Sequence, residues 1–243
     1  MAFVHGKSTA VYLDAINLSA FLNAADFSVD VDTADTTTFS SSWKTALVGS
    51  QAAKAEFGGL YDPTDTTLVD TIGDEYALTG GVLTVAPAGA AAIGDRCRLM
   101  SIASTTYTES SPVGGVVMVK WSVLASAAVG FGDILHPLAE DTNTTTGADK
   151  DDTSPTSTGW LAHLHVTAAD GGSWVVKLQD AATTDWTDVS GGAFAAVTGA
   201  DTERLLSATT TSDLRRHVRY VATRTGGSAG DGITFALGYA RNR

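Results

Sequence analysis

The chain has 243 residues, of which 17% are charged, and its formal net charge is −12. This length allows one large β domain or two ordinary ones, and the low charged fraction excludes a coiled coil, a basic nucleic-acid-binding arm and a largely disordered chain. A single cysteine, Cys97, excludes an internal disulfide and a cluster of thiolate metal ligands. The first residues do not resemble a leader peptide and the sequence has no long apolar run, so we expect neither export nor membrane insertion.

Alternating apolar and polar residues predict the strands of the first part of the chain. Residues 9–13 suit a short strand, and residues 27–39 give the clearest alternation. The apolar residues of this second strand fall on one face, whereas Asp26, Asp30 and Asp32 fall on the other. We expect the apolar face to pack and the acidic face to meet water.

A long loop is predicted after this strand. A strand over residues 53–60 follows at hairpin distance, so residues 40–52 would project from the sheet. Trp43 and Leu47 are costly to leave in water, and we predict that the loop, including Lys44, contacts a neighbouring subunit. The alternative is that these side chains fold back locally.

One regular helix is predicted over residues 62–72. Pro63 suits the first helical position, and Gly73 supplies a stop. Strands resume between Gly, Pro and Ser turn signals, over residues 81–87, 96–108 and 115–127. The sequence therefore predicts a first domain over residues 1–140, an all-β sandwich or barrel with one short helix.

A linker and a second domain follow. Residues 141–158 are rich in Thr, Asp and Gly, which predicts a linker. Short alternating strands come next, over residues 160–167, 174–180, 193–197, 217–224 and 233–241. This spacing predicts a second domain over residues 159–243, a small Ig-like or jelly-roll-like β-sandwich.

The order of these elements resembles the major tail tube proteins of siphophages, the bacteriophages with long non-contractile tails. The resemblance covers most of residues 5–135 and rests on the order and spacing of several segments, namely 6–14 (GKSTAVYLD), 17–23 (NLSAFLN), 30–39, 57–62 (FGGLYD) and 111–117 (SPVGGVV). Residues 159–243 are similar to the additional sandwich that some tail proteins carry, and also to carbohydrate-binding sandwiches.

This resemblance implies a structural virion protein without enzymatic activity. Its copies would close into hexameric or threefold rings by pairing their sheets, which removes an edge otherwise open to aggregation. The rings would stack into the hollow tail tube, bridged by the first few residues and by residues 40–52. The implied partners are further copies, a tape measure protein and tail terminator or tail tip proteins, with assembly in the host cytoplasm and no cofactor, metal or membrane.

The charge distribution suits a channel that DNA traverses without specific binding. The first 154 residues carry 7 Lys and Arg against 19 Asp and Glu, whereas the rest carry 8 of each. Tight DNA binding needs cations that displace phosphate counterions, so the acidic part would repel DNA. We therefore predict that Asp26, Asp30 and Asp32 line the lumen; a purely solubilising role is the alternative.

No residue pattern indicates a catalytic or metal site. His163 and His165 lie two apart, but no third ligand is evident, so surface histidines are the favoured interpretation. No Gly-x-Ser-x-Gly nucleophile motif occurs. We predict that the tryptophans of the second domain, namely Trp160, Trp174 and Trp186, lie in its core.

A basic cluster in the second domain is a candidate for contacts on the outside of the tube. It consists of Arg215, Arg216 and Arg219. A competing hypothesis is a capsid decoration protein or a glycan-binding adhesin whose second sandwich recognises surface glycans. Such a protein would stay discrete, whereas a tube protein would assemble into rings or filaments.

Overall fold

The computed structural model of the chain describes residues 6–39, 42–61, 80–207 and 213–241. Within these ranges every regular element is a strand apart from one 3-10 turn, η1 (Gly6–Ser8), which confirms the all-β prediction. The helix predicted over residues 62–72 lies outside the described residues. Nowhere in the described ranges is there a helix long and apolar enough to span a membrane.

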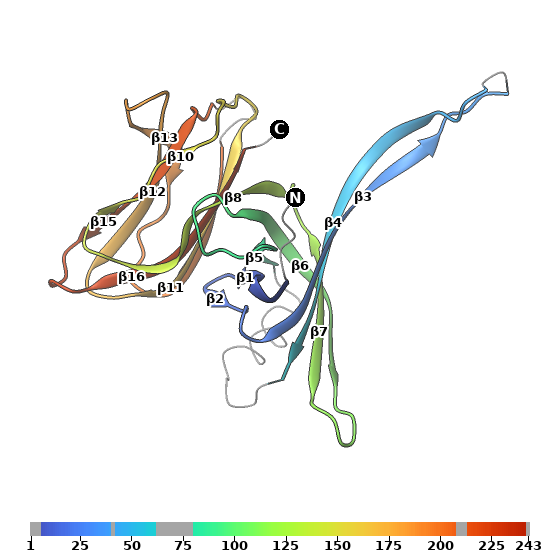
Figure 1. Ribbon diagram of the computed structural model, residues 1–243, viewed down its shortest axis with the longest axis horizontal. Coiled ribbons are helices and arrows are strands. Elements are labelled where there is room, and N and C mark those ends of the chain that lie inside the picture. Colours follow the sequence, from blue (N-terminus) through green and yellow to red (C-terminus); the bar gives the residue numbers. More distant parts are fainter. Residues whose placement is uncertain (1–5, 40–41, 62–79, 208–212, 242–243) are drawn as a thin grey trace. The chain divides into compact units, whose positions relative to one another are not determined.

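The strands fall into two compact units. The first unit comprises residues 1–20, 81–101 and 128–243, and the second comprises residues 21–80 and 102–127. The second unit contains β3 (Leu22–Asp35), β4 (Ala46–Leu60), β7 (Met118–Ala125) and the later part of β6 (Arg96–Ser110) (Figure 1). The first unit contains the start of β6 and the strands β1 (Ala10–Leu13), β2 (Ile16–Asn17), β5 (Gly80–Ala86), β8 (Gly130–Thr142), β9 (Thr145–Thr146), β10 (Lys150–Asp151), β11 (Trp160–Ala169), β12 (Ser173–Ala181), β13 (Thr187–Ala193), β14 (Asp201–Leu206), β15 (His217–Thr225) and β16 (Gly232–Arg241).

The first unit is a β-sandwich. One sheet runs in the order β14-β11-β16-β8-β6-β5-β1-β2, and the other runs β10-β15-β12-β13, with β9 also paired to β15. Alternate residues of β11 and β16 meet alternate residues of β12 and β15 in the main core, where Trp160, Trp174, Tyr220 and Phe235 are buried. Burial of Trp160 and Trp174 confirms the prediction, whereas Trp186 is half-buried.

The strands β11 and β16 bury both faces. Their other residues, including Leu161 and Ala236, form a smaller cluster with Tyr12 of β1 and with Cys97 and Leu99 of β6. Cys97 is fully buried, and burial together with the nearby Asp133 carboxylate raises the pKa of its thiol. A strand buried on both faces shows little alternation in sequence.

The observed units do not follow the predicted boundaries of domain and linker. Strand β8 pairs with β16, and the short strands β9 and β10 inside residues 141–158 pair with β15. Pro137 lies in β8 where the register with β16 shifts, and such a bulge tolerates a residue without an N–H. Gly132 is also required in β8, because a Cβ there would collide with the carbonyl oxygen of Tyr239.

The second unit is an antiparallel sheet in the order β3-β4-β7-β6. One face is apolar: the Phe57 and Trp121 rings stack with centroids 5.2 Å apart, and Ala55 and Val123 are fully buried. The Trp121 indole N–H donates to Ser104 Oγ at 2.9 Å, which satisfies its only polar group. These contacts fix the root of the hairpin that β3 and β4 form.

Candidate assembly surface

A long two-stranded arm projects from the second unit. Strand β4 pairs with β7 only from Lys54 to Leu60, whereas residues 46–53 of β4 pair with β3 alone in the described part of the chain. At about 3.4 Å per residue these eight residues extend the arm by roughly 27 Å. The arm is the blue hairpin that rises away from β7 in Figure 1.

The sequence prediction for this region was wrong in its local structure. Residues 46–52 belong to β4 and are not part of a loop, and β3 ends at Asp35, before Phe39. The turn between them is held by threonines: Thr36 N–H donates to Thr45 O at 2.9 Å, and Thr45 N–H donates to Thr37 Oγ1 at 3.0 Å. Over its described residues, 22–39 and 42–60, the projecting element is therefore a hairpin of two paired strands.

The arm carries exposed apolar side chains. Trp43 is 81% exposed, Leu47 and Val48 are about two-thirds exposed, and Phe39 is fully exposed. The expected packing of the apolar face of β3 does not extend along the arm, because Val29 and Val31 are also exposed. An isolated two-stranded hairpin is marginally stable in water, so this arrangement favours contact with another molecule.

The outer edge of β3 is a second notable feature. In the described residues β3 pairs with β4 on one side and with nothing on the other, although it is 14 residues long. An edge of this length presents a row of unpaired N–H and C=O groups, which natural proteins usually cover, twist or shorten. The edge is thus a ready surface for pairing with another strand.

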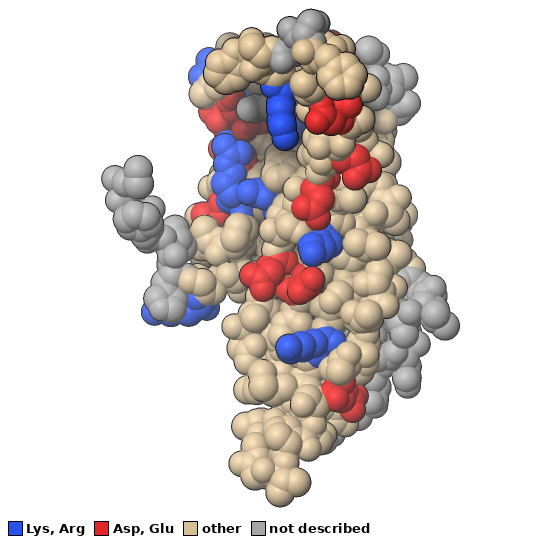
Figure 2. All heavy atoms as spheres, turned by 90° about the vertical axis from the view of Figure 1, so that its right-hand side faces the viewer, with Lys and Arg blue, Asp and Glu red and all other residues tan. Residues whose placement is uncertain are grey.

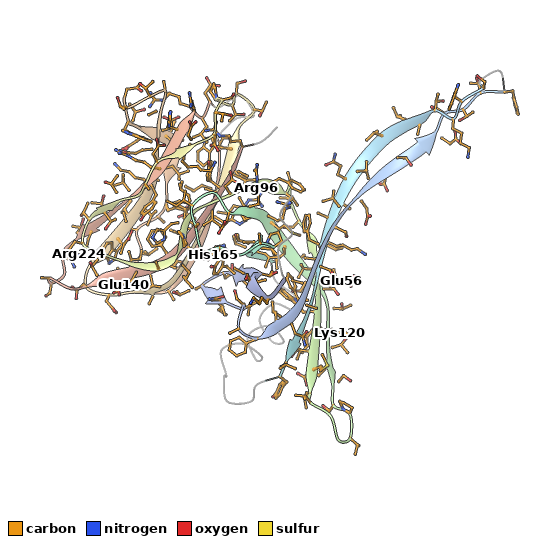
Figure 3. The ribbon with its side chains drawn as sticks, in the orientation of Figure 1. Glu56, Arg96, Lys120, Glu140, His165 and Arg224 are labelled. Carbon is orange, nitrogen blue, oxygen red and sulfur yellow. The ribbon has the colours of Figure 1, made fainter. Side chains whose placement is uncertain are left out.

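The face of the sheet opposite the Phe57–Trp121 stack is polar and charged. Asp26, Asp30 and Asp32 are all exposed on β3, as the alternation predicts, and Asp26 lies opposite Glu56 of β4. Lys54 lies 3.7 Å from Glu56, and Lys120 of β7 projects from the same face (Figure 3). Figure 2 looks onto the right-hand side of Figure 1 and shows acidic and basic side chains interspersed on a largely uncharged surface.

The unit as a whole is strongly acidic despite these lysines. By sequence its two segments, residues 21–80 and 102–127, contain 11 Asp and Glu against 3 Lys and no Arg. Two-thirds of the net charge of the chain therefore belongs to the unit that carries the arm and the open edge.

The arginines predicted as exterior contacts are engaged within the first unit. The Arg215 guanidinium donates to Asp180 Oδ1 at 2.9 Å and to Asp185 Oδ2 at 2.6 Å. Arg216 donates to Asp151 at 2.6 Å, and Arg219 donates to Gln179 and stacks on Trp186. These contacts link β10 and β12 to β15 and to the two residues that precede it, so the guanidinium groups serve the fold of the second sheet.

The two histidines considered as metal ligands are buried, which corrects the prediction that they lie on the surface. Thr84 Oγ1 lies 2.7 Å from Nε2 of His165 and 3.2 Å from Nδ1 of His163. His165 Nδ1 lies 2.7 Å from the Asp14 carbonyl oxygen, which can only accept, so Nδ1 carries the proton and Nε2 accepts from Thr84. Thr84 then accepts from His163, and the chain of hydrogen bonds joins β5 and β11 to Asp14, in the turn that follows β1.

Both histidines are neutral at ordinary pH. Burial lowers the pKa of His165 to about 4. Burial, with the neighbouring His165 and the Arg204 guanidinium, holds the pKa of His163 well below its usual range. Among the described residues no group of three or more His, Cys, Asp or Glu side chains could hold a metal ion.

A polar cavity of about 370 Å³ lies among β6, β8, β10 and β16 of the first unit. Its charged groups pair with one another: Lys150 Nζ lies 3.0 Å from Asp152 and 3.5 Å from Asp133, and Arg241 Nε lies 2.7 Å from Asp152. Tyr239 also donates to Asp152 at 2.6 Å. The network ties the short strand β10 to the larger sheet.

Comparison with known proteins gives neither a matching family model nor a matching curated protein. Among solved structures, a chain of the virion of a native gene transfer agent particle is 18% identical, with a TM-score of 0.43 over 53% of this chain and 98% of that chain. A chain of the sheath–tube complex of an extracellular contractile injection system is 13% identical, with a TM-score of 0.42 over 53% and 92%. The SPP1 Dit protein is 11% identical, with a TM-score of 0.36 over 96% and 98%. At TM-scores below 0.5 the chain is not assigned to a family.

Proposed function

We propose that this chain is the structural subunit of a bacteriophage tail tube, closing into rings that stack into a hollow shaft. The observation that carries the proposal is the outer edge of β3, which pairs with no other described strand, on an antiparallel sheet that also bears the projecting arm. A monomer with these features would be prone to uncontrolled association. A closed ring of copies would pair this long edge in every copy.

Ring closure would pair the β3 edge of one copy with the β6 side of the next. Each copy then contributes the four strands β3, β4, β7 and β6 to a continuous barrel. A closed barrel has no sheet edges. A contact between two different surfaces of identical chains forms a closed ring when a whole number of copies completes one full turn.

The width of such a barrel favours sixfold over threefold symmetry. Strands spaced about 4.8 Å apart and tilted by about 40° each occupy roughly 6 Å of circumference. Six copies, with roughly 24 strands, give a diameter of about 48 Å, and three copies give about 24 Å. Once side chains of about 6 Å line each wall, only the larger barrel admits a DNA duplex about 20 Å wide. This supports a hexameric ring.

The charged face of the second unit would then line the bore. Asp26, Asp30 and Asp32 stand on the face opposite the buried Phe57–Trp121 stack, so they are free to meet solvent. An acidic wall repels phosphates within about a Debye length of 8 Å, which would let DNA pass during ejection without adhering. The lysines on the same face moderate this field without reversing it.

The position of the sandwich, the partners and the location of the protein are proposed from the resemblance to tail tube proteins. We place the strands of residues 159–243 on the outside of the tube, where their sheets need not crowd the bore. The partners would be further copies, a tape measure protein and tail terminator or tail tip proteins, with the tube assembled in the host cytoplasm and located in the virion. The role is structural, without catalysis or a cofactor.

The second candidate is a decoration protein or adhesin that binds glycans through the second sheet. The Arg219–Trp186 pair, with centroid distance 4.1 Å, is the feature that favours it, because an aromatic ring beside polar groups suits a sugar. Against it, the guanidinium already covers one face of that ring. This candidate gives no role to the arm or the open edge.

Electron microscopy of the purified protein separates the two proposals. A tube subunit should form rings of uniform diameter or hollow filaments as its concentration rises. Discrete particles at every concentration, together with localisation of the chain outside the tail shaft in virions, would contradict the tube function. Rotational averaging of end views gives the number of copies in a ring.

A further inference from the structure

We infer that Lys150 and Asp133 condense into an intramolecular amide bond that joins the two sheets of the first unit covalently. Lys150 is the first residue of β10 in the smaller sheet, and Asp133 lies in β8 of the larger sheet. Strand β10 has two residues and pairs with β15 alone among the described strands, so little strand pairing holds it in place. The bond closes a loop of residues 133–150 in a chain whose single cysteine rules out a disulfide. This inference is independent of the proposed tube function.

The Lys150 amine lies between two carboxylates at the polar cavity. Its Nζ is 3.0 Å from Asp152 Oδ1 and 3.5 Å from Asp133 Oδ2. A Cβ on residue 94, which is glycine, would lie only 3.1 Å from Lys150 Cε, so the lysine side chain packs closely against this loop. Gly94 N–H donates at 2.8 Å to the carbonyl oxygen of Ile134, the residue after Asp133. One loop therefore positions both the amine and the carboxyl group, and reacting groups held in contact react far faster than separate molecules.

The surroundings of the two carboxylates select Asp133 as the one that reacts. Asp152 Oδ2 accepts from the Tyr239 hydroxyl at 2.6 Å and from Arg241 Nε at 2.7 Å, so this carboxylate is fully engaged and stays ionised. Asp133 is only 7% exposed, yet its Oδ1 accepts no hydrogen bond from the described residues. Arg96 Nη1 lies 3.2 Å from that oxygen without the geometry of a hydrogen bond. A positive group in this position stabilises the negative charge that develops on the oxygen when the carboxyl carbon is attacked.

The reaction is a condensation that needs no oxidant, reductant or cofactor. As the ammonium group of Lys150 gives up a proton, its nitrogen lone pair attacks Cγ of Asp133 and the Nζ–Cγ bond forms. The Cγ–Oδ2 bond then breaks, and Oδ2 leaves as water with two protons that came from the ammonium group, while Oδ1 remains as the amide oxygen. Asp152 contacts the amine and relays protons from the nitrogen to the leaving oxygen. An ammonium and a carboxylate become a neutral amide, so the site no longer has to hold that buried ion pair.

A second lysine–aspartate pair in the first unit lacks the features of this site. Lys177 Nζ lies 2.8 Å from Asp188 Oδ2, and the Asp188 side chain is 55% exposed. The other carboxylate oxygen accepts from Gln179 at 2.8 Å, and among the described residues no second carboxylate forms an ion pair with Lys177. We expect this pair to remain an ordinary ion pair, which makes Lys177 the matched control.

The test is mass spectrometry of the denatured full chain. We expect the wild-type chain to be lighter by one water molecule than its sequence predicts. Digestion after glutamate cuts at Glu140, between the two reacting residues, and should leave fragments 110–140 and 141–203 joined through Asp133 and Lys150. Lys150→Arg keeps the positive charge but cannot condense, so it should have the full mass and give separate fragments. Lys177→Arg should keep both the loss of water and the joined fragments.

The joined fragments are sought in the wild-type chain, so the test does not depend on the folding of a variant. Separate fragments from wild-type protein would overturn the inference and reduce the contact to an ion pair. A loss of water that persists in Lys150→Arg would also overturn it, because a succinimide at Asp170–Gly171 or Asp231–Gly232 would then be the source.

The role of Asp152 is tested by the rate of condensation in freshly refolded protein. Asp152→Asn cannot take up a proton, so it should lose water about a hundredfold more slowly than wild type or slower still. Circular dichroism checks that this variant has refolded. An unchanged rate in the folded variant would refute the relay of protons through Asp152.

Discussion

Replacing Asp30 and Asp32 by asparagine tests whether the charged face lines the bore. In a sixfold barrel about 150 Å around, equivalent aspartates of neighbouring copies lie roughly 25 Å apart. Two charges at that distance repel by about 0.2 kcal/mol in water, and screening over a Debye length of about 8 Å reduces this to about 0.01 kcal/mol. Asp30 and Asp32 themselves lie about 7 Å apart along the strand, where screened repulsion is only about 0.2 kcal/mol. The double variant should therefore assemble at the wild-type concentration.

The effect on DNA should be much larger than the effect on assembly. Asp30→Asn with Asp32→Asn removes two charges per copy and so weakens the repulsive wall; Asp30→Lys with Asp32→Lys reverses it. Each lysine that meets a phosphate contributes a salt-dependent attraction, so DNA retention by the lysine tubes should fall steeply as salt rises. We expect slower DNA ejection from particles with asparagine tails and retained DNA with lysine tails.

Cosedimentation of linear duplex DNA with purified tubes measures retention, and a titration from low to high salt gives its slope. Asp201→Lys, at an exposed acid of β14 in the first unit, is the control for added positive charge. If the asparagine variant fails to form tubes, these carboxylates belong to a contact between copies. If lysine tubes retain no more duplex than the control, the face is not one that DNA reaches, and the bore assignment is refuted.

Further predictions concern the fold and the arm. Since the pKa of His165 is lowered to about 4 in the folded chain and is about 6.5 in the unfolded chain, this histidine should contribute a loss of up to about 3 kcal/mol in the free energy of unfolding as pH falls from 6.5 to 4. His163, whose pKa is also lowered, should add to this loss. Urea titrations at pH 7 and 4.5 measure the decline, and His165→Gln should reduce it by the His165 share. Gly132→Ala should destabilise the first unit by about 2 kcal/mol or more, because its Cβ would strike Tyr239 O; an unchanged urea midpoint would contradict that packing. The fluorescence emission of Trp43, which is 81% exposed, should shift to shorter wavelength on assembly, and Trp43→Phe should abolish the shift; equal spectra for rings and tubes would argue that the arm stays in water.

Local patterns predicted most strands but not their partners. Strands with one buried face, such as β4 and β12, were found because apolar residues recur at every second position. Strand β8 was missed because Pro137 and two glycines are typical of turns. In the structure Pro137 lies at the bulge, and the glycines are needed because β16 passes close to them. Strand β14 was missed because its sequence lacks alternation, and it is held by pairing with β11.

In the candidate assembly surface, too, local features could be predicted whereas features that depend on distant residues could not. The acidic face of β3 could be predicted from alternation, since residues two apart in a strand share a face whatever the tertiary structure. The length of the arm could not, because residues 46–52 gain their strand structure only from β3. The burial of His163 and His165 also could not be predicted. Strand β11 is buried on both faces, and these polar side chains are tolerated there because they form hydrogen bonds with Thr84, which is about 80 residues away in sequence.

The state of the one cysteine makes the protein convenient for chemical labelling. Maleimides and similar reagents attack the thiolate, and the thiol of Cys97 is both enclosed and held protonated. A cysteine introduced at an exposed position would then react alone, without replacement of the native one. Each copy could carry a single fluorophore or gold particle at a chosen site, and a finished assembly would display that marker at every repeat.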